Sequence, residues 1–200
     1  MGEELMRPVS ATFGEALQYT SRLHAGQARK QTQIPYISHL MTVAALVFEA
    51  GGSETAAIGA LLHDAAEDQG GEPTLATIRA KFGPAVEEIV RHCSDDIVAE
   101  GDKKRPWRIR KSEYIARLAD TDATNDALLV SLADKLHNCM AIVTDVSLHG
   151  PSVWDRFNGQ PEDIAWYYNE ILQIAQRKLP GNRLTNQLEL WVPQLSAAAA

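Results

Sequence analysis

Helical periodicity runs through almost the whole sequence and is punctuated by capping residues, glycines and prolines. The segments SATFGEALQYTSRLHAG, HLMTVAALVFEAGG and ETAAIGALLHDAAED repeat apolar residues at helical spacing, and each has a serine at or just before its start: Ser10, Ser38 and Ser53. Serine is a favoured N-cap because its side-chain oxygen accepts a backbone N–H of the first turn. TLATIRAKFG and PAVEEIVRHCSD follow as two predicted helices, broken at Gly83-Pro84. We find no convincing alternating strand pattern and no internal repeat, so the sequence predicts an all-α fold of about eight to ten helices.

The C-terminal half continues this pattern after a polar, irregular stretch at residues 95–106. Three further helices are predicted in WRIRKSEYIARLA, TNDALLVSLADKLHNCMAIVTDV and PEDIAWYYNEILQIAQRKL, with a loop, SLHGPSVWDRFNGQ, before the third. NRLTNQLELWVPQL closes the fold, and we expect the alanine-rich end at 196–200 to be a frayed tail. The chain, 1–200, is therefore interpreted as one domain with a core over about residues 10–195.

Composition limits the class of protein. Hydrophobic residues make up 45% of the 200 positions, which is enough for one full core. The formal net charge of −7 argues against a nucleic-acid polymer as partner, whereas a local basic patch beside a bound cation still allows a small anionic substrate. No apolar run approaches the roughly 20 residues of a membrane span and no signal peptide is recognisable, so we expect a cytoplasmic protein without a membrane partner. Cys93 and Cys139 stand alone, which favours buried thiols over a zinc or redox pair.

The segment GALLHDAAEDQGG, residues 59–71, places four ionisable side chains in an otherwise apolar predicted helix. His63 and Glu67 are four residues apart, and so are Asp64 and Asp68, so that each pair lies on a common face one turn apart. Burying such groups costs free energy unless a partner neutralises them. The rest of the chain must supply that partner.

Two other segments contribute groups of the same kind. His39 opens a helix directly after the proline loop QTQIPYIS, and Asp134 lies in the apolar stretch SLADKLHN, with Asn138 one turn later. Together with His63 and Asp64 they form a set of two imidazoles and two carboxylates, which suits a divalent first-row metal. Such a cation would be the partner of the buried charges. The four other histidines have no such neighbours and are interpreted as structural or surface residues: His24, His92, His137 and His149.

The motifs HAGQARK, PYISHL, ALLHDAAED, FGPAVEEIV and LADKLHN together carry a family resemblance. The order of histidines and aspartates resembles the HD superfamily of metal-dependent phosphohydrolases. More closely, the five motifs are similar to those of the hydrolase domain of RelA/SpoT proteins, over about residues 13 to 192. The chain leaves no room for a synthetase domain, so it resembles a stand-alone small alarmone hydrolase.

This resemblance implies an α-helical HD fold that binds one Mn²⁺ ion, or another divalent first-row metal. It also implies hydrolysis of the 3′-pyrophosphate of (p)ppGpp to GDP or GTP and pyrophosphate. It implies four metal ligands: His39, His63, Asp64 and Asp134. An acidic pair is implied to orient water and move protons: Glu67 and Asp68. Contacts to the nucleotide are implied for a basic pair, an amide and an aromatic residue: Arg29, Lys30, Asn138 and Tyr168, with the adjacent Tyr167 as the alternative aromatic.

The sequence departs from the family pattern in two places. Alanines occupy positions 65 and 66, and Gln69 stands where the family commonly has threonine. The segment DKKRPWRIRKSEY is more basic than the pattern, and its cations either face solvent or reach the substrate phosphates: Lys103, Lys104, Arg105, Arg108, Arg110 and Lys111.

These departures leave alternatives open. Adenosine alarmones such as ppApp, NADPH or a deoxynucleotide are alternative substrates of an HD phosphohydrolase. A non-catalytic HD binding module is a further alternative, although the presence of all four ligand residues argues against it. The sequence leaves open whether the chain forms a homo-oligomer.

Overall fold

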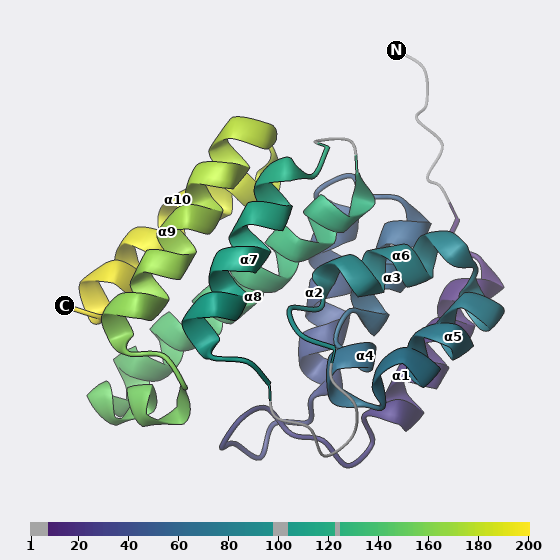
Figure 1. Cartoon of the computed structure of the whole chain (residues 1–200), viewed down its shortest axis with the longest axis horizontal. Coiled ribbons are helices and arrows are strands. Elements are labelled where there is room, and N and C mark those ends of the chain that lie inside the picture. The colour runs from purple at the N-terminus through teal and green to yellow at the C-terminus, as the bar shows by residue number, and fades with distance from the viewer. Residues whose placement is uncertain (1–7, 98–103, 123–124) are drawn as a thin grey trace.

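A computed structural model describes residues 8–97, 104–122 and 125–200. Within these ranges the protein contains ten α-helices, one 3₁₀ helix and no β-strand, so the predicted all-α fold is confirmed (Figure 1). In chain order the elements are α1 (Ala11–Leu23), α2 (Ile37–Glu49), α3 (Glu54–Leu62), α4 (Ala65–Asp68), α5 (Gly71–Phe82), α6 (Pro84–Cys93), α7 (Trp107–Asp120), α8 (Asp126–His149), the 3₁₀ helix η1 (Pro151–Arg156), α9 (Pro161–Lys178) and α10 (Arg183–Ala198).

Helix α8 forms the centre of the fold. It packs against α2, α3 and α6 of the N-terminal half and against α9, α10 and η1 of the C-terminal half (Figure 1). Leu128, Leu132 and Leu136 are fully buried in it. Within the described residues, α8 alone has the length and apolar composition of a membrane-spanning helix, and 56% of its apolar window is buried inside the protein. Its central position accounts for this composition.

Local capping signals were reliable predictors of several helix ends. The Ser10 hydroxyl oxygen accepts the N–H of Thr12 at 3.1 Å, and that of Ser53 accepts the N–H of Ala56 at 3.0 Å. The predicted break at Gly83-Pro84 is confirmed, with Pro84 in the first turn of α6. Both cysteines are free and buried, as expected.

Other expected boundaries were wrong. Ser38 is not the N-cap of α2, because the helix begins at Ile37 and the Ser38 hydroxyl donates to the Pro35 carbonyl. The predicted loop SLHGPSVWDRFNGQ is largely helical, since α8 continues to His149 and the 3₁₀ helix η1 follows after Gly150. At the C-terminus, α10 extends through Ala198 and so includes much of the segment expected to fray.

The predicted helix over ETAAIGALLHDAAED is two helices. α3 ends at Leu62, α4 begins at Ala65, and His63 and Asp64 form the turn between them. Close packing holds this end of α3 in place, because a Cβ at Gly59 would lie 2.6 Å from the Ile89 side chain on α6. The helix break therefore lies at a rigid point of the core.

Candidate functional site

Four side chains from three parts of the chain converge between α2, α3 and α8. His39 lies on α2, His63 and Asp64 form the turn after α3, and Asp134 lies on α8. The Nε2 atom of His63 is 3.0 Å from Asp64 Oδ2 and 3.5 Å from Asp134 Oδ1. The Nε2 atom of His39 is 3.6 Å from the same Asp64 oxygen and 3.2 Å from the same Asp134 oxygen. The structure thus brings together all four residues expected to bind a metal.

The hydrogen-bonding state of the two imidazoles fits a cation between them. Both Nε2 atoms are buried and have no hydrogen-bond partner within the described residues. The Nδ1 atom of His63 contacts the Ala60 carbonyl at 2.7 Å, so in the neutral ring Nδ1 carries the proton and Nε2 has the lone pair that a cation can bind. Lone pairs and carboxylate oxygens that face one another repel, and a divalent ion with mixed nitrogen and oxygen ligands would satisfy all of them.

The electrostatics of the cluster also favour positive charge. Burial disfavours an imidazolium, yet the carboxylates of Asp64 and Asp134 outweigh it and hold the pKa of His63 well above its usual value. Burial likewise raises the pKa of each carboxyl group, but His63 beside Asp64 and Lys135 beside Asp134 outweigh it and hold both pKa values well below the usual range. The site therefore keeps both carboxylates ionised.

Neighbouring side chains hold the four groups in position. The Tyr36 hydroxyl donates to Asp64 Oδ2 at 2.5 Å, and the Asn138 amide donates to Asp134 Oδ1 at 2.6 Å. Lys135 forms an ion pair with the other oxygen of Asp134.

His137 is a site residue that the sequence interpretation missed. Its Nδ1 atom lies 2.6 Å from Nδ1 of His39, and the two rings stack. Burial and the neighbouring His39 lower the pKa of His137 to about 4, so the neutral ring can accept the His39 Nδ1–H. The available signal was its spacing of three residues from Asp134, which places both on one face of α8. The other three histidines do not join the cluster: His24 contacts Gln27, His92 contacts Thr121, and His149 is exposed at the end of α8.

The acidic pair of the short helix α4 lies beside the cluster. Glu67 accepts hydrogen bonds from the Lys104 ammonium at 2.6 Å and from the Asp95 backbone N–H at 3.2 Å. Burial and the Asp95 carboxylate raise the pKa of Glu67. Asp68 accepts a hydrogen bond from the Gln27 amide at 2.8 Å. A carboxylate with a raised pKa is suited to general acid–base chemistry.

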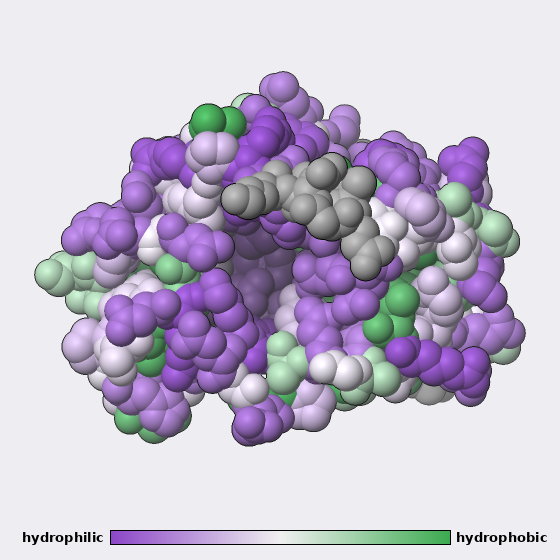
Figure 2. Space-filling model, turned by 60° about the horizontal axis from the view of Figure 1, so that its bottom comes forward, coloured by the Kyte–Doolittle hydropathy of each residue, from purple (hydrophilic) through white to green (hydrophobic). Residues whose placement is uncertain are grey.

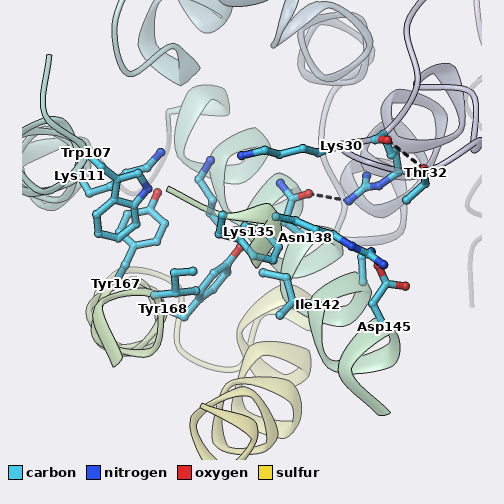
Figure 3. A pocket seen from close by; sticks show the side chains of 15 residues that line it. Lys30, Thr32, Trp107, Lys111, Lys135, Asn138, Ile142, Asp145, Tyr167 and Tyr168 are labelled. Carbon is cyan, nitrogen blue, oxygen red and sulfur yellow. Dashed lines mark hydrogen bonds and ion pairs between the residues drawn. The ribbon is translucent and has the colours of Figure 1, made fainter. Parts of the chain in front are cut away.

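A cavity of about 270 Å³ opens beside the four converging groups, since Asn138 and Lys135, which both contact Asp134, line it. All four residues expected to contact a nucleotide line it: Arg29, Lys30, Asn138 and Tyr168. Tyr167, the alternative aromatic residue, lines it as well, so both tyrosines face the cavity (Figure 3). Adjacent residues of a helix point about 100° apart, and the cavity is wide enough to reach both. The face in Figure 2 is hollowed near its centre, with hydrophilic residues dominating the wall.

The loop before α2 carries Arg29 into the cavity. The backbone pairs Arg29 N–H with the Ile34 carbonyl and Tyr36 N–H with the Gln27 carbonyl, both at 2.9 Å, so the loop folds back on itself. The guanidinium of Arg29 donates to Asn138 Oδ1 at 3.0 Å, while its Nη1 atom is buried without a partner within the described residues. Asn138 thereby connects the cavity to Asp134, one of the four converging groups.

The basic segment divides between the site and the surface. Lys111 lines the cavity, and Lys104 contacts Glu67. Arg110 is buried in an ion pair with Asp95, at 2.6 Å. Arg105 and Arg108 are half-exposed and pair with carboxylates away from the cavity lining. Lys103 lies outside the described residues. Neither the solvent-facing nor the substrate-facing interpretation describes the whole segment.

This chain is similar to an HD domain family model and to proteins named for the hydrolysis or synthesis of guanosine polyphosphates. A family model described as an HD domain matches residues 16–164. The guanosine-3′,5′-bis(diphosphate) 3′-pyrophosphohydrolase MESH1 of Xenopus tropicalis is 29% identical over 182 residues, which cover 90% of this chain and 89% of that protein. A GTP pyrophosphokinase of Streptomyces coelicolor is 34% identical over 124 residues, which cover 62% of this chain and 14% of that protein. A solved structure of a metazoan orthologue of SpoT, described as hydrolysing ppGpp, is 28% identical, has a TM-score of 0.70, and aligns over 94% of this chain and 97% of its own.

Proposed function

Since the chain belongs to the HD domain family of metal-dependent phosphohydrolases, we propose that it removes the 3′-pyrophosphate of (p)ppGpp-type alarmones. The products of this reaction are GDP or GTP and pyrophosphate. The observation that supports the proposal is that two residues connect the four converging groups with the cavity. Asn138 and Lys135 both contact Asp134 and both line the cavity, so a phosphate held there would lie beside the residues that would hold the metal.

Within this proposal the metal is Mn²⁺, and its ligands are the four converging groups: His39, His63, Asp64 and Asp134. Three of them offer donor atoms within 4.8 Å of one another, and all three residues are buried: His39, His63 and Asp134. A bound divalent ion supplies Lewis acidity to a phosphoryl oxygen and makes water a stronger nucleophile near neutral pH.

The acidic pair carries the proton transfers of the proposed reaction. Glu67 has a raised pKa, and a carboxylate of that kind accepts a proton from the attacking water and returns it to the departing oxygen. Gln27 donates to Asp68 and so fixes one of its oxygens, which leaves the other oxygen to hold the water in line. Lys104 keeps Glu67 in place through its ion pair.

Local cations explain how a protein of net charge −7 binds a polyanion. Arg29, Lys30, Lys111 and Lys135 all line the cavity. Within the described residues, Nη1 of Arg29 has no hydrogen-bond acceptor, and a phosphate oxygen is a suitable one. Positive charge at this place also stabilises the negative charge that develops on the phosphoryl oxygens and on the ribose 3′-oxygen as water attacks phosphorus and the bond between phosphorus and that oxygen breaks.

A product assay tests the proposal directly. Purified protein is loaded with Mn²⁺ and incubated with ppGpp, ppApp, NADPH and a deoxynucleoside monophosphate, and the released phosphate species are separated. Pyrophosphate from ppGpp at a higher kcat/KM than any other substrate supports the proposal. Orthophosphate release from NADPH or a deoxynucleotide, with ppGpp untouched, would assign the site to another HD phosphohydrolase activity. Tight ppGpp binding without turnover at any metal concentration would point to a binding module.

A further inference from the structure

One face of α8 runs from the metal cluster along the length of the cavity. Asp134, Asn138, Ile142 and Asp145 follow one another at spacings of four, four and three residues, which keeps them on a common stripe. Figure 3 shows Asn138, Ile142 and Asp145 in this order along the cavity. The seven helical steps from Asn138 to Asp145 span about 10 Å of helix rise, comparable to the length of a nucleoside from its 3′-oxygen to the far edge of its base.

The end of this stripe carries a polar pair on an apolar wall. Asp145 Oδ2 accepts a hydrogen bond from Arg156 Nη1 at 2.8 Å, and both residues line the cavity. Their side chains are 33% and 19% exposed, so neither is a freely solvated surface group. Ile142 and Phe157 line the cavity beside them and offer apolar surface to a flat ring. The contact uses one oxygen of the carboxylate and one nitrogen of the guanidinium, and each group retains further hydrogen-bonding capacity.

We propose that Asp145 and Arg156 form the guanine-selective edge of the cavity. The inference rests on the proposed function and names the base of its substrate. Guanine presents two neighbouring donors, N1–H and the N2 amino group, which match the two oxygens of one carboxylate. Its O6 and N7 atoms are acceptors that an arginine side chain recognises well. Adenine has a single exocyclic donor beside an acceptor, so it satisfies the carboxylate only in part and leaves one carboxylate oxygen facing an acceptor atom of the base.

Nucleotide binding tests this inference without relying on turnover. Titration calorimetry with the Mn²⁺-loaded protein measures the Kd of GDP, of IDP, which lacks only the N2 amino group, and of ADP. We expect GDP to bind at least about tenfold more tightly than IDP and ADP, because a hydrogen bond to a charged group is lost in both analogues. In Asp145→Asn the preference for GDP over IDP should fall to about twofold or less, since an amide cannot accept both donors. Arg156→Gln should weaken GDP and IDP equally, because both carry O6.

The matched control is Asp155→Asn. Asp155 is the exposed carboxylate next to Arg156 in the chain and lies outside the cavity lining, so its removal should leave the preference for GDP intact. Equal Kd values for GDP, IDP and ADP in the wild type, or a full GDP preference in Asp145→Asn, would overturn the inference and restrict the pair to anchoring η1 on α8. Hydrolysis of ppGpp with no base preference would leave the proposed function standing. Failure of every nucleotide to bind would count against both.

Discussion

The Nε2 atom of His63 lies 3.0 Å from Oδ2 of Asp64, although the two residues are neighbours in the chain. On a continuous helix, the side chains of adjacent residues leave the axis about 100° apart. Here α3 ends at Leu62 and α4 begins at Ala65, and the turn between them directs both side chains toward His39 and Asp134. The two neighbouring residues at this helix junction therefore both belong to the converging cluster.

Removing one carboxylate of this site should release the metal. We expect Asp64→Asn to lower the Mn²⁺ content of the purified protein from about one ion to a small fraction, because the amide brings no charge to balance the cation. Elemental analysis measures the loss. Adding Mn²⁺ should raise the melting temperature of the wild type but not of the variant, since only a bound ion stabilises the folded state. An unchanged metal content in Asp64→Asn would remove this residue from the ligand set.

His137 should tune metal affinity without being a ligand. His137→Phe keeps the ring volume but removes the acceptor for His39 Nδ1–H, which orients the His39 ring. Loss of such an outer contact weakens metal binding by about 10- to 100-fold. The Kd for Mn²⁺, measured by competition with a chelator, should rise within that range. His149→Phe, at the exposed end of α8, is the matched control. Wild-type affinity in His137→Phe would mean that packing alone positions His39.

Substitutions in the acidic pair, Glu67 and Asp68, should lower kcat without changing the metal content. Glu67→Gln and Asp68→Asn preserve shape but remove the carboxylate that accepts a proton, so we expect kcat to fall by about 100-fold or more. Metal content should remain that of the wild type, because neither residue belongs to the four converging groups. Glu88→Gln, an exposed change on α6, is the control for a lost surface charge. A variant of the pair that loses its metal instead belongs among the ligands.

Replacing Arg29 or Lys30 with alanine should raise the KM for ppGpp. Arg29→Ala removes a cavity-lining guanidinium whose Nη1 atom has no partner among the described residues, and one lost hydrogen bond to a charged group corresponds to about 10- to 150-fold in affinity. Lys30→Ala removes a more exposed charge, so its smaller defect should shrink further at high salt. Steady-state kinetics at two salt concentrations compare both variants with Arg22→Ala, an exposed arginine on α1. Wild-type KM in both would place the phosphate contacts at Lys111 and Lys135.

The buried ion pairs of Asp95 should make stability depend on acid pH. Burial raises the pKa of this carboxyl, but Lys111 and Arg110 outweigh it and hold the pKa well below its usual range. The stabilisation is therefore complete above the unfolded-state pKa of about 3.9 and is lost as the pH falls through the lower folded-state pKa. Asp95→Asn should cost about 3 kcal/mol or more at pH 7, because it leaves two buried cations without their counter-charge. Denaturant unfolding at pH 7 and pH 3 should show the difference from wild type shrinking on acidification. A difference that stays constant with pH would mean that the charge of Asp95 contributes nothing.

Much of the fold follows from local signals in the sequence. The serine caps at Ser10 and Ser53 and the Gly83-Pro84 break act within one turn of the chain, so they are readable without tertiary structure. The histidines and carboxylates in the order His39, His63-Asp64 and Asp134 were likewise recognisable, because metal chemistry restricts ligands to a few residue types. That these groups bind the metal stays a prediction, which the metal-content measurements above address.

What tertiary packing alone decided is how distant groups meet. The turn at His63 and Asp64 lies between the tightly packed α3 and α4, and no residue type in HDAAED predicts a helix break there. The contact between His39 and His137 joins positions 98 residues apart, and its existence depends on how α2 packs against α8. The pairing of Asp145 with Arg156 depends on how η1 folds back onto α8. Helix periodicity specifies which face of a helix is buried, but the partner of that face, and therefore the shape and charge of the cavity, is set by the assembled core.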